Sequence, residues 1–121
     1  MNIEIPGVNV DKGLELCEGD TDIYLRFLRR YTTSMPDCLE KMLNVSEETL
    51  KDHTINAHGA KNICEIIGAE EIAERAKQLE LMGRDRDLAG VLSRNNDFIK
   101  HAEIVVDAIR NWLKAHDAEN A

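Results

Sequence analysis

Two helical patterns lie on either side of one glycine in residues 50–81, LKDHTINAHGAKNICEIIGAEEIAERAKQLEL. The first pattern repeats every three or four residues, the spacing of one helix face, through Leu50, His53 or Thr54, Ala57, Ala60 or Lys61, Cys64 and Ile67. Ser46 is its predicted N-cap, and Gly68 ends it, as glycine commonly does just past a helix. The second pattern runs from about Glu70 to Leu81. So short a connection makes the two predicted helices antiparallel neighbours.

The chain before this pair continues the helical periodicity. We predict an extended lead-in over residues 1–7, a short helix that ends near Cys17, and a longer helix that begins at Asp20 or Thr21. Pro36 interrupts the longer pattern, and it bends or splits that helix because proline has no backbone N–H to donate.

The chain after the pair predicts one more long helix. A turn over residues 82–85 leads to a start at Asp85 or Asp87 and an end near His116, and residues 117–121 are expected to fray. Short connections between long amphipathic helices favour antiparallel packing. The sequence therefore predicts a single all-α domain over residues 1–121, an up-down four-helix bundle with a short additional N-terminal helix.

Composition narrows the class of protein. The chain has 121 residues, a formal net charge of −8 and 43% hydrophobic residues, which fits one globular domain. An acidic chain is a poor partner for nucleic acid, because phosphate binding needs a basic face. The apolar runs are too short for membrane insertion, and the first ten residues lack the pattern of a secretory signal. We therefore expect a cytoplasmic protein.

Metal binding is not predicted. The three cysteines, Cys17, Cys38 and Cys64, are odd in number and form no Cys-x-x-Cys spacing, so neither a disulfide framework nor a zinc site is expected. Each lies among apolar neighbours and is interpreted as a small core residue.

One polar patch in the quoted stretch suits phosphoryl chemistry. His58 follows Ala57 of the apolar stripe, so it lies at the edge of the buried face or outside it. Lys61 and Asn62, three and four residues further on, share its surface of the helix. An uncharged imidazole is a nucleophile at neutral pH. Phosphoryl transfer needs mainly positioning and charge stabilisation, and a nearby lysine supplies the charge.

Spacing alone leaves other interpretations open. A helical histidine beside a lysine is usually a solvated surface pair, and an unrelated bundle that dimerises through an apolar face would show the same periodicity. His53 is interpreted as a residue at the boundary of the core, and His101 and His116 as solvated side chains.

A wider register surrounds His58. It consists of a lysine at +3, a small residue at +4, Ile67-Gly68-Ala69 at +9 to +11, and the helix ending Ala76-Lys77-Gln78-Leu79-Glu80. Upstream, GVNVDKGLELCEGDTDIYLRFLRRY (residues 7–31) adds Gly-Leu, Gly-Asp and Tyr-x-x-x-Leu features. In these two segments the chain resembles the histidine phosphotransfer (HPt) domain family. The likeness covers nearly the whole chain and is weakest after Leu81.

The resemblance implies a phosphorelay intermediate of two-component signal transduction. His58 would accept a phosphoryl group from the phosphoaspartate of a response-regulator receiver domain and pass it to another receiver, with Lys61 stabilising the phosphoryl charge. No autonomous kinase activity is expected, and the chain has no Gly-rich phosphate loop. The resemblance implies no cofactor of its own, with Mg²⁺ bound only in the receiver. A hybrid sensor kinase is a further candidate partner, and a monomer is expected.

Asn62 departs from the family pattern, which most often has Gly or Ser at +4 to leave room for the incoming receiver. Its amide can hydrogen-bond the phosphoryl group or the imidazole, or it can narrow access. The alternative function is therefore an HPt-fold module that binds receivers or regulates them without phosphotransfer.

Five further residues are candidates for contacting a receiver: Ile55, Gly59, Glu65, Arg30 and Tyr31. Arg26 and Arg29 extend the basic cluster on the second helix, and opposite charges on two surfaces favour docking. Glu65, two turns from His58, is also a candidate for an interaction with the imidazole.

Overall fold

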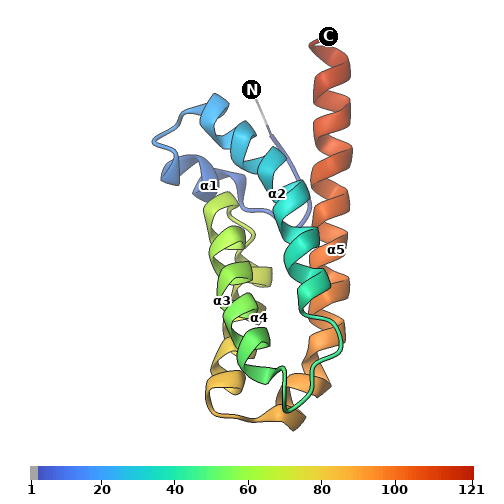
Figure 1. Cartoon of the computed structure of the whole chain (residues 1–121). Helices are drawn as coiled ribbons and strands as arrows, with labels where there is room; N and C mark the ends of the chain where they lie inside the picture. The colour runs from blue at the N-terminus through green and yellow to red at the C-terminus, as the bar shows by residue number, and fades with distance from the viewer. Residues whose placement is uncertain (1–2) are drawn as a thin grey trace.

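The structure is a computed structural model that describes residues 3–121, and this part of the chain forms five helices (Figure 1). They are α1 (Val10–Leu16), α2 (Thr21–Lys41), α3 (Leu50–Ile67), α4 (Glu70–Arg84) and α5 (Leu88–Glu119). From α2 to α5 the helices run alternately up and down, each packs against the next, and α5 closes the ring against α2. The short α1 packs on α2 and α3. The predicted all-α fold, a helical bundle with a short N-terminal helix, is confirmed.

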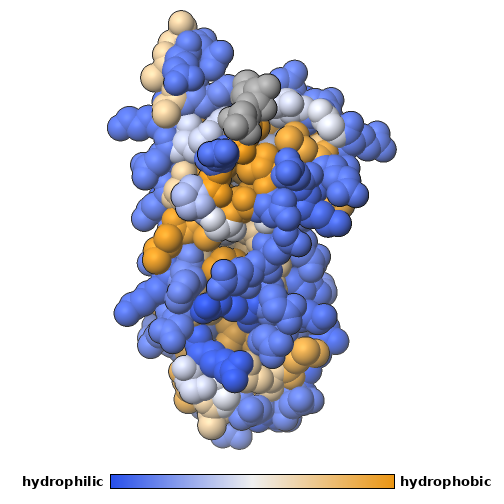
Figure 2. All heavy atoms as spheres, turned by 180° about the vertical axis from the view of Figure 1, so that it is seen from behind, coloured by the Kyte–Doolittle hydropathy of each residue, from blue (hydrophilic) through white to orange (hydrophobic). Residues whose placement is uncertain are grey.

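Apolar stripes from the four longer helices meet inside the ring. Tyr24, Leu28, Phe98 and Ile109 are among the largest fully buried side chains. Seen from behind, the surface is mostly hydrophilic, and apolar side chains show mainly in its upper half (Figure 2). Among residues 3–121, no helix combines the length and the apolar character that crossing a membrane requires. The apolar faces predicted from the amphipathic patterns thus point into the bundle.

The closest helix pair in the bundle is α3 and α4, which make the most extensive interface. Both helices bury small residues, among them Ala57 on α3 and Ala73, Ala76 and Gly83 on α4. A Cβ atom on Gly83 would overlap the hydroxyl oxygen of Thr54, so only glycine allows this approach. The short distance lets a side chain of α4 reach the outer surface of α3.

Gly68 ends α3 as predicted. Its φ of +87° is in the left-handed region that favours glycine. A Cβ atom there would also overlap the carbonyl oxygen of Asn9. The backbone N–H of Asn9 donates to the Gly68 carbonyl at 2.8 Å, so this turn also anchors the start of α1.

Two helix boundaries around α3 and α4 differ from the prediction. Ser46 is not the N-cap of α3, because Ser46 and Thr49 hydrogen-bond each other in a separate turn and the helix begins only at Leu50. The turn predicted over residues 82–85 is also wrong. Helix α4 continues to Arg84, with Gly83 buried against α3.

The last helix begins at Leu88, directly after the predicted start residue Asp87, and ends later than predicted. The Asp87 side chain accepts a hydrogen bond from the Gly90 N–H at 2.9 Å and caps α5. The helix continues past His116 to Glu119. Asp117 accepts two hydrogen bonds from Arg29 of α2, at 2.6 and 2.9 Å, so residues 117–119 are helical rather than frayed.

A buried polar link joins α3, α5 and the end of α2. Nε2 of His53 lies 2.7 Å from Oδ1 of Asn95, whose Nδ2 donates to the Met42 carbonyl at 2.8 Å. His53 is only 2% exposed, so its predicted place at the boundary of the core is wrong. Burial lowers the pKa of His53, and the hydrogen bond with Asn95 offsets only part of that effect. The neutral ring therefore donates its Nε2–H to Asn95.

Pro36 does not split α2, which is one helix from Thr21 to Lys41. Proline has no N–H to donate to the carbonyl four residues earlier, which is that of Thr32. Arg110 of α5 donates to this carbonyl instead, with Nη2 at 2.8 Å. A neighbouring helix thus satisfies the acceptor that proline leaves open.

Because Arg110 supplies the hydrogen bond that Pro36 cannot, we predict that substitutions at these two positions are energetically coupled. Replacing Arg110 by Met should lower the free energy of unfolding by about 1 kcal/mol, because the Thr32 carbonyl loses its donor. In a Pro36→Ala background the same replacement should cost clearly less, because the backbone N–H that alanine restores then donates to Thr32. Urea unfolding of the double-mutant cycle measures the difference. Arg94→Met, on an exposed position of α5, is the matched control, and equal costs in both backgrounds would contradict the coupling.

Candidate functional site

His58 lies on the outer surface of α3, at the edge that faces α4. Its side chain is 48% exposed, whereas Ala57 beside it is fully buried. The predicted position at the edge of the buried face is confirmed, so the ring is open to an approaching molecule.

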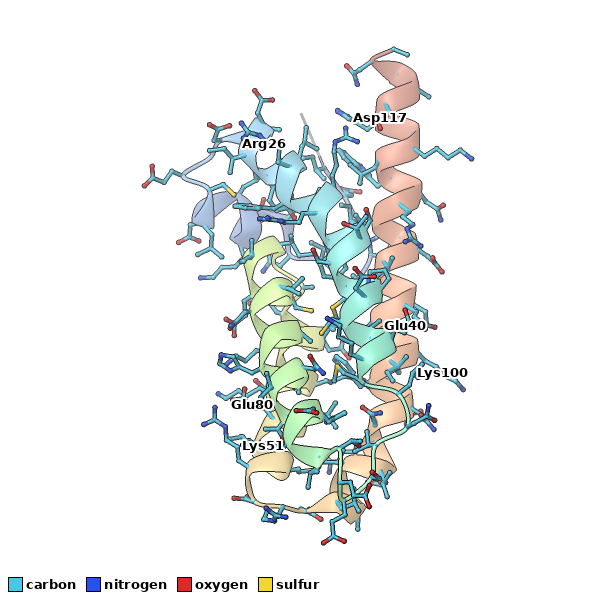
Figure 3. All side chains as sticks on the ribbon, in the orientation of Figure 1. Arg26, Glu40, Lys51, Glu80, Lys100 and Asp117 are labelled. Atoms are coloured by element: carbon cyan, nitrogen blue, oxygen red, sulfur yellow. The ribbon has the colours of Figure 1, made fainter. Side chains whose placement is uncertain are left out.

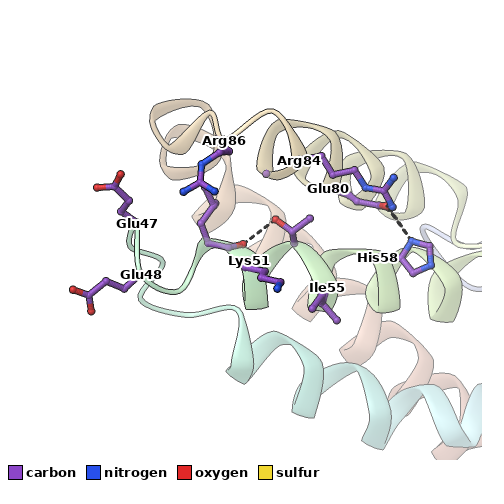
Figure 4. Close-up of a pocket in the computed structure, with 11 residues that line it drawn as sticks. Glu47, Glu48, Lys51, Ile55, His58, Glu80, Arg84 and Arg86 are labelled. Atoms are coloured by element: carbon purple, nitrogen blue, oxygen red, sulfur yellow. Dashed lines mark hydrogen bonds and ion pairs between the residues drawn. The ribbon is translucent and has the colours of Figure 1, made fainter.

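The imidazole of His58 is oriented by a carboxylate from the neighbouring helix. Nδ1 lies 3.1 Å from both carboxylate oxygens of Glu80, and the other ring nitrogen points away from Glu80 (Figure 4). A carboxylate only accepts hydrogen bonds when ionised, so it holds the ring proton on Nδ1. Nε2 of the neutral ring is then left with a free electron pair, which is the nucleophilic form.

Glu80 itself is almost fully buried, at 4% exposure, and is surrounded by positive groups. The Lys61 ammonium lies 3.5 Å from Oε1, and the guanidinium of Arg84 pairs with Oε2. Burial raises the pKa of Glu80, but the hydrogen bond with His58 and the surrounding charges lower it more, and the net pKa lies below the ordinary 4.5. The carboxylate is therefore ionised at neutral pH.

Glu80 is the functional residue that sequence reasoning missed. The motif contained it, but no role in the site was assigned to any residue of α4. A signal was present, because Glu80 shares the inward stripe of α4 with Ala73, Ala76 and Gly83 at helical spacing. A charged residue in a buried stripe requires partners of opposite charge. Glu65, a candidate for an interaction with the imidazole, is exposed on α3, and Glu80 is the acid beside His58.

The structure brings together only part of the predicted site. His58 and Lys61 converge on Glu80, so the predicted proximity of an imidazole and an ammonium is present. Asn62 is exposed on the same side of α3. Ile55 is 60% exposed, and a Cβ atom on Gly59 would meet no atom within 4 Å, so the surface beside His58 is open.

The candidate partner-contacting residues on α2 differ in their exposure and pairing. Tyr31 is only 1% exposed, and its hydroxyl lies 3.7 Å from the Cys64 sulfur inside the core. Arg29 is paired with Asp117, while Arg30 is exposed. Tyr31 is therefore withdrawn as a residue that contacts a partner, because its side chain belongs to the packing of α2 on α3.

A groove of about 610 Å³ extends from His58 along α3 and α4 to the turn before α5 (Figure 4). It is lined by Glu47, Glu48, Leu50, Lys51, Thr54, Ile55, His58, Glu80, Gly83, Arg84 and Arg86. The sequence predicted a turn before the last helix but gave it no role in the site. The fold brings this turn to the same groove as His58, because α3 and α4 are antiparallel.

The orientation of the His58 ring can be tested directly. We expect the proton of the neutral ring to reside on Nδ1, and Glu80→Ala should release it to Nε2 in a large fraction of molecules. Glu80→Gln is the matched control, since its amide oxygen still accepts from Nδ1. Two-bond ¹H–¹⁵N NMR correlations at pH 8 distinguish the tautomers. A native ring protonated on Nε2 would refute the assignment.

The lowered pKa of Glu80 has a consequence for stability. Between its folded-state pKa and 4.5 the unfolded chain binds more protons, so the contribution of Glu80 is complete above pH 4.5 and is lost as pH falls through the folded-state pKa. We expect Glu80→Gln to cost about 2 kcal/mol at pH 7, with the difference shrinking below pH 4.5. Urea unfolding from pH 7 to pH 3 measures it. Glu103→Gln controls for loss of an exposed carboxylate, and a difference that stays constant down to pH 3 would contradict the prediction.

Comparisons with known proteins identify no relative of this chain. No protein-family model matches it, and neither a curated protein nor a solved structure does. Its function is therefore inferred from the chemistry of the cluster formed by His58, Lys61, Glu80 and Arg84.

Proposed function

We propose that this chain is a histidine phosphotransfer protein that accepts a phosphoryl group on His58 from the phosphoaspartate of a receiver domain and passes it to another receiver. The observation that carries the proposal is the exposed imidazole whose Nδ1 is held by the buried carboxylate of Glu80. A ring in this state has its nucleophilic nitrogen directed to solvent, where a phosphorylated protein can reach it.

The transfer step balances with groups that the site contains. The electron pair on Nε2 attacks phosphorus, the N–P bond forms, and the P–O bond to the aspartyl carboxylate breaks. The aspartate leaves as a carboxylate that keeps the electron pair of the broken P–O bond. The ring proton stays on Nδ1, so the phosphorylated ring becomes positive next to Glu80. The ion pair across 3.1 Å favours the charged ring, and the reverse sequence returns the group to a second aspartate.

Lys61 and Arg84 have separate parts in this proposal. Lys61, half-buried one helical turn from His58, supplies positive charge towards the phosphoryl oxygens as they approach. Arg84, in its ion pair, neutralises Glu80 from the other side. The two cations keep the buried carboxylate ionised without removing the hydrogen bond to His58. No cofactor is assigned to this chain, and Mg²⁺ is expected in the receiver.

Asn62 favours a second candidate, a module that binds receivers without transfer. Its side chain is exposed on α3 four residues from His58 and lies on the side from which a receiver would approach. In this reading Asn62→Gly restores phosphorylation that the native chain lacks. In the leading proposal the native chain is phosphorylated and Asn62→Gly changes only the rate.

Labelling of His58 tests the proposal. The native chain should acquire acid-labile, base-stable phosphate from a phosphorylated receiver domain and from phosphoramidate, whose P–N bond breaks as ammonia leaves. His58→Gln should abolish the label, because no nucleophile remains at the site. His101→Gln, an exposed histidine on α5, should not. Intact-mass spectrometry and hydrolysis at acid and alkaline pH measure both.

The outcomes separate the candidates. Label that persists in His58→Gln would show that another residue is the acceptor. Receiver binding without label in the native chain would favour the binding module. Absence of both label and binding would reject the phosphotransfer proposal.

A further inference from the structure

Two cationic side chains line the groove beside His58, and neither forms an ion pair with any residue in the described range 3–121. Lys51 and Arg86 are exposed there, in a chain whose formal net charge is −8. Ile55, 60% exposed, lies on α3 between Lys51 and His58. The groove thus combines an apolar contact, free positive charge and the reactive ring on one surface.

Arg86 holds a backbone conformation that an arginine does not favour. Its φ is +58°, in the left-handed region, directly after Asp85 at the end of α4. The turn is closed by the backbone, through the N–H of Arg86 to Gly83 and the N–H of Asp87 to Met82. Glycine would form the same turn with less strain. The fold therefore has no need of the arginine side chain at this position.

We propose that this groove is the docking site for the acidic surface that surrounds the phosphoaspartate of the donor protein, with Lys51 and Arg86 pairing with its carboxylates and Ile55 covered by the contact. The proposal rests on the phosphotransfer function. A phosphoaspartate site that uses Mg²⁺ must hold the ion with further carboxylates, so its surroundings are negative. Such a surface is repelled by most of this chain and attracted by the groove.

The arginine cluster of α2 fits this partner less well. Arg26 lies at the end of the bundle opposite Lys51 and Glu80 (Figure 3), and Arg29 is already paired with Asp117. Lys51 and Arg86 instead share one groove with His58. A partner that reaches the ring along this groove contacts both cations at once.

Two acids, Glu47 and Glu48, limit the groove. They line its far end, and their side chains extend away from His58 in Figure 4. The attractive part of the surface is therefore the stretch from Arg86 to His58, and the partner's carboxylates are expected to avoid the Glu47 end.

Arg86→Gly separates recognition from stability. The variant should unfold at a higher urea concentration, because glycine relieves the left-handed conformation. It should also lower kcat/KM for transfer from the receiver domain that labels His58 fastest by about three- to fivefold at low salt, with the effect shrinking as salt screens the charge. Arg86→Glu should lower kcat/KM by about tenfold or more. A loss of transfer in a more stable protein does not come from unfolding.

Glu18→Gly is the matched control. Glu18 has a φ of +53° in the turn after α1, so glycine relieves the same conformation away from the groove. It should raise stability and leave kcat/KM unchanged. Phosphoramidate serves as a donor without a protein surface, and its rate of labelling His58 should be the same in native, Arg86→Gly and Glu18→Gly proteins.

Each result has one meaning. An unchanged kcat/KM in both Arg86 variants, or a loss with Arg26→Glu instead, overturns the groove as docking site and leaves phosphotransfer standing. Equal losses with receiver and phosphoramidate place Arg86 in the chemistry of His58 and also overturn docking. If no donor labels His58 in the native chain, the proposed function fails, and the docking proposal fails with it.

Discussion

A carboxylate buried between two helices determines the arrangement of this site. Glu80 is nearly inaccessible, and an ionised group in such a place is stable only if positive partners and hydrogen bonds surround it. His58, Lys61 and Arg84 provide them from α3 and from α4 itself. The imidazole is thus oriented by the hydrogen bond that it donates to the buried Glu80 carboxylate. Gly83, which packs directly on Thr54, allows the two helices to approach closely enough for this contact.

Local sequence signals predicted the fold well, because the apolar periodicity of each helix and the helix end at Gly68 depend on residues close together in the sequence. The errors occurred where a contact distant in sequence overrides a local signal. Ser46 is a good N-cap candidate, yet it closes a turn with Thr49. Helix α4 ends later than predicted, where Gly83 packs on Thr54 of α3. Helix α5 also ends later than predicted, where Asp117 pairs with Arg29 of α2.

Only the part of the site that lies on one helix could be predicted from the sequence. His58 and Lys61 lie on one helix, so their spacing reveals that they are neighbours. Glu80 lies 22 positions from His58, and its contact depends on how α4 is rotated and shifted against α3. Tyr31 shows the opposite error, since a tyrosine in a basic stretch suggested a surface residue while its ring fills the space between α2 and α3. Periodicity alone does not fix how far each helix is rotated about its own axis, and that rotation decides which side chains meet a neighbouring helix.

The polar link through His53 and Asn95 has a further consequence for the uniqueness of the bundle. Apolar stripes repeat along each helix, so a core of leucine, valine and alanine tolerates α5 displaced by a full turn along its neighbours. Such a displacement would leave the imidazole, the amide and the Met42 carbonyl buried with no partner, at about 1–3 kcal/mol for each group. The three polar groups thereby favour the observed alignment of α5 over alignments displaced by a helical turn.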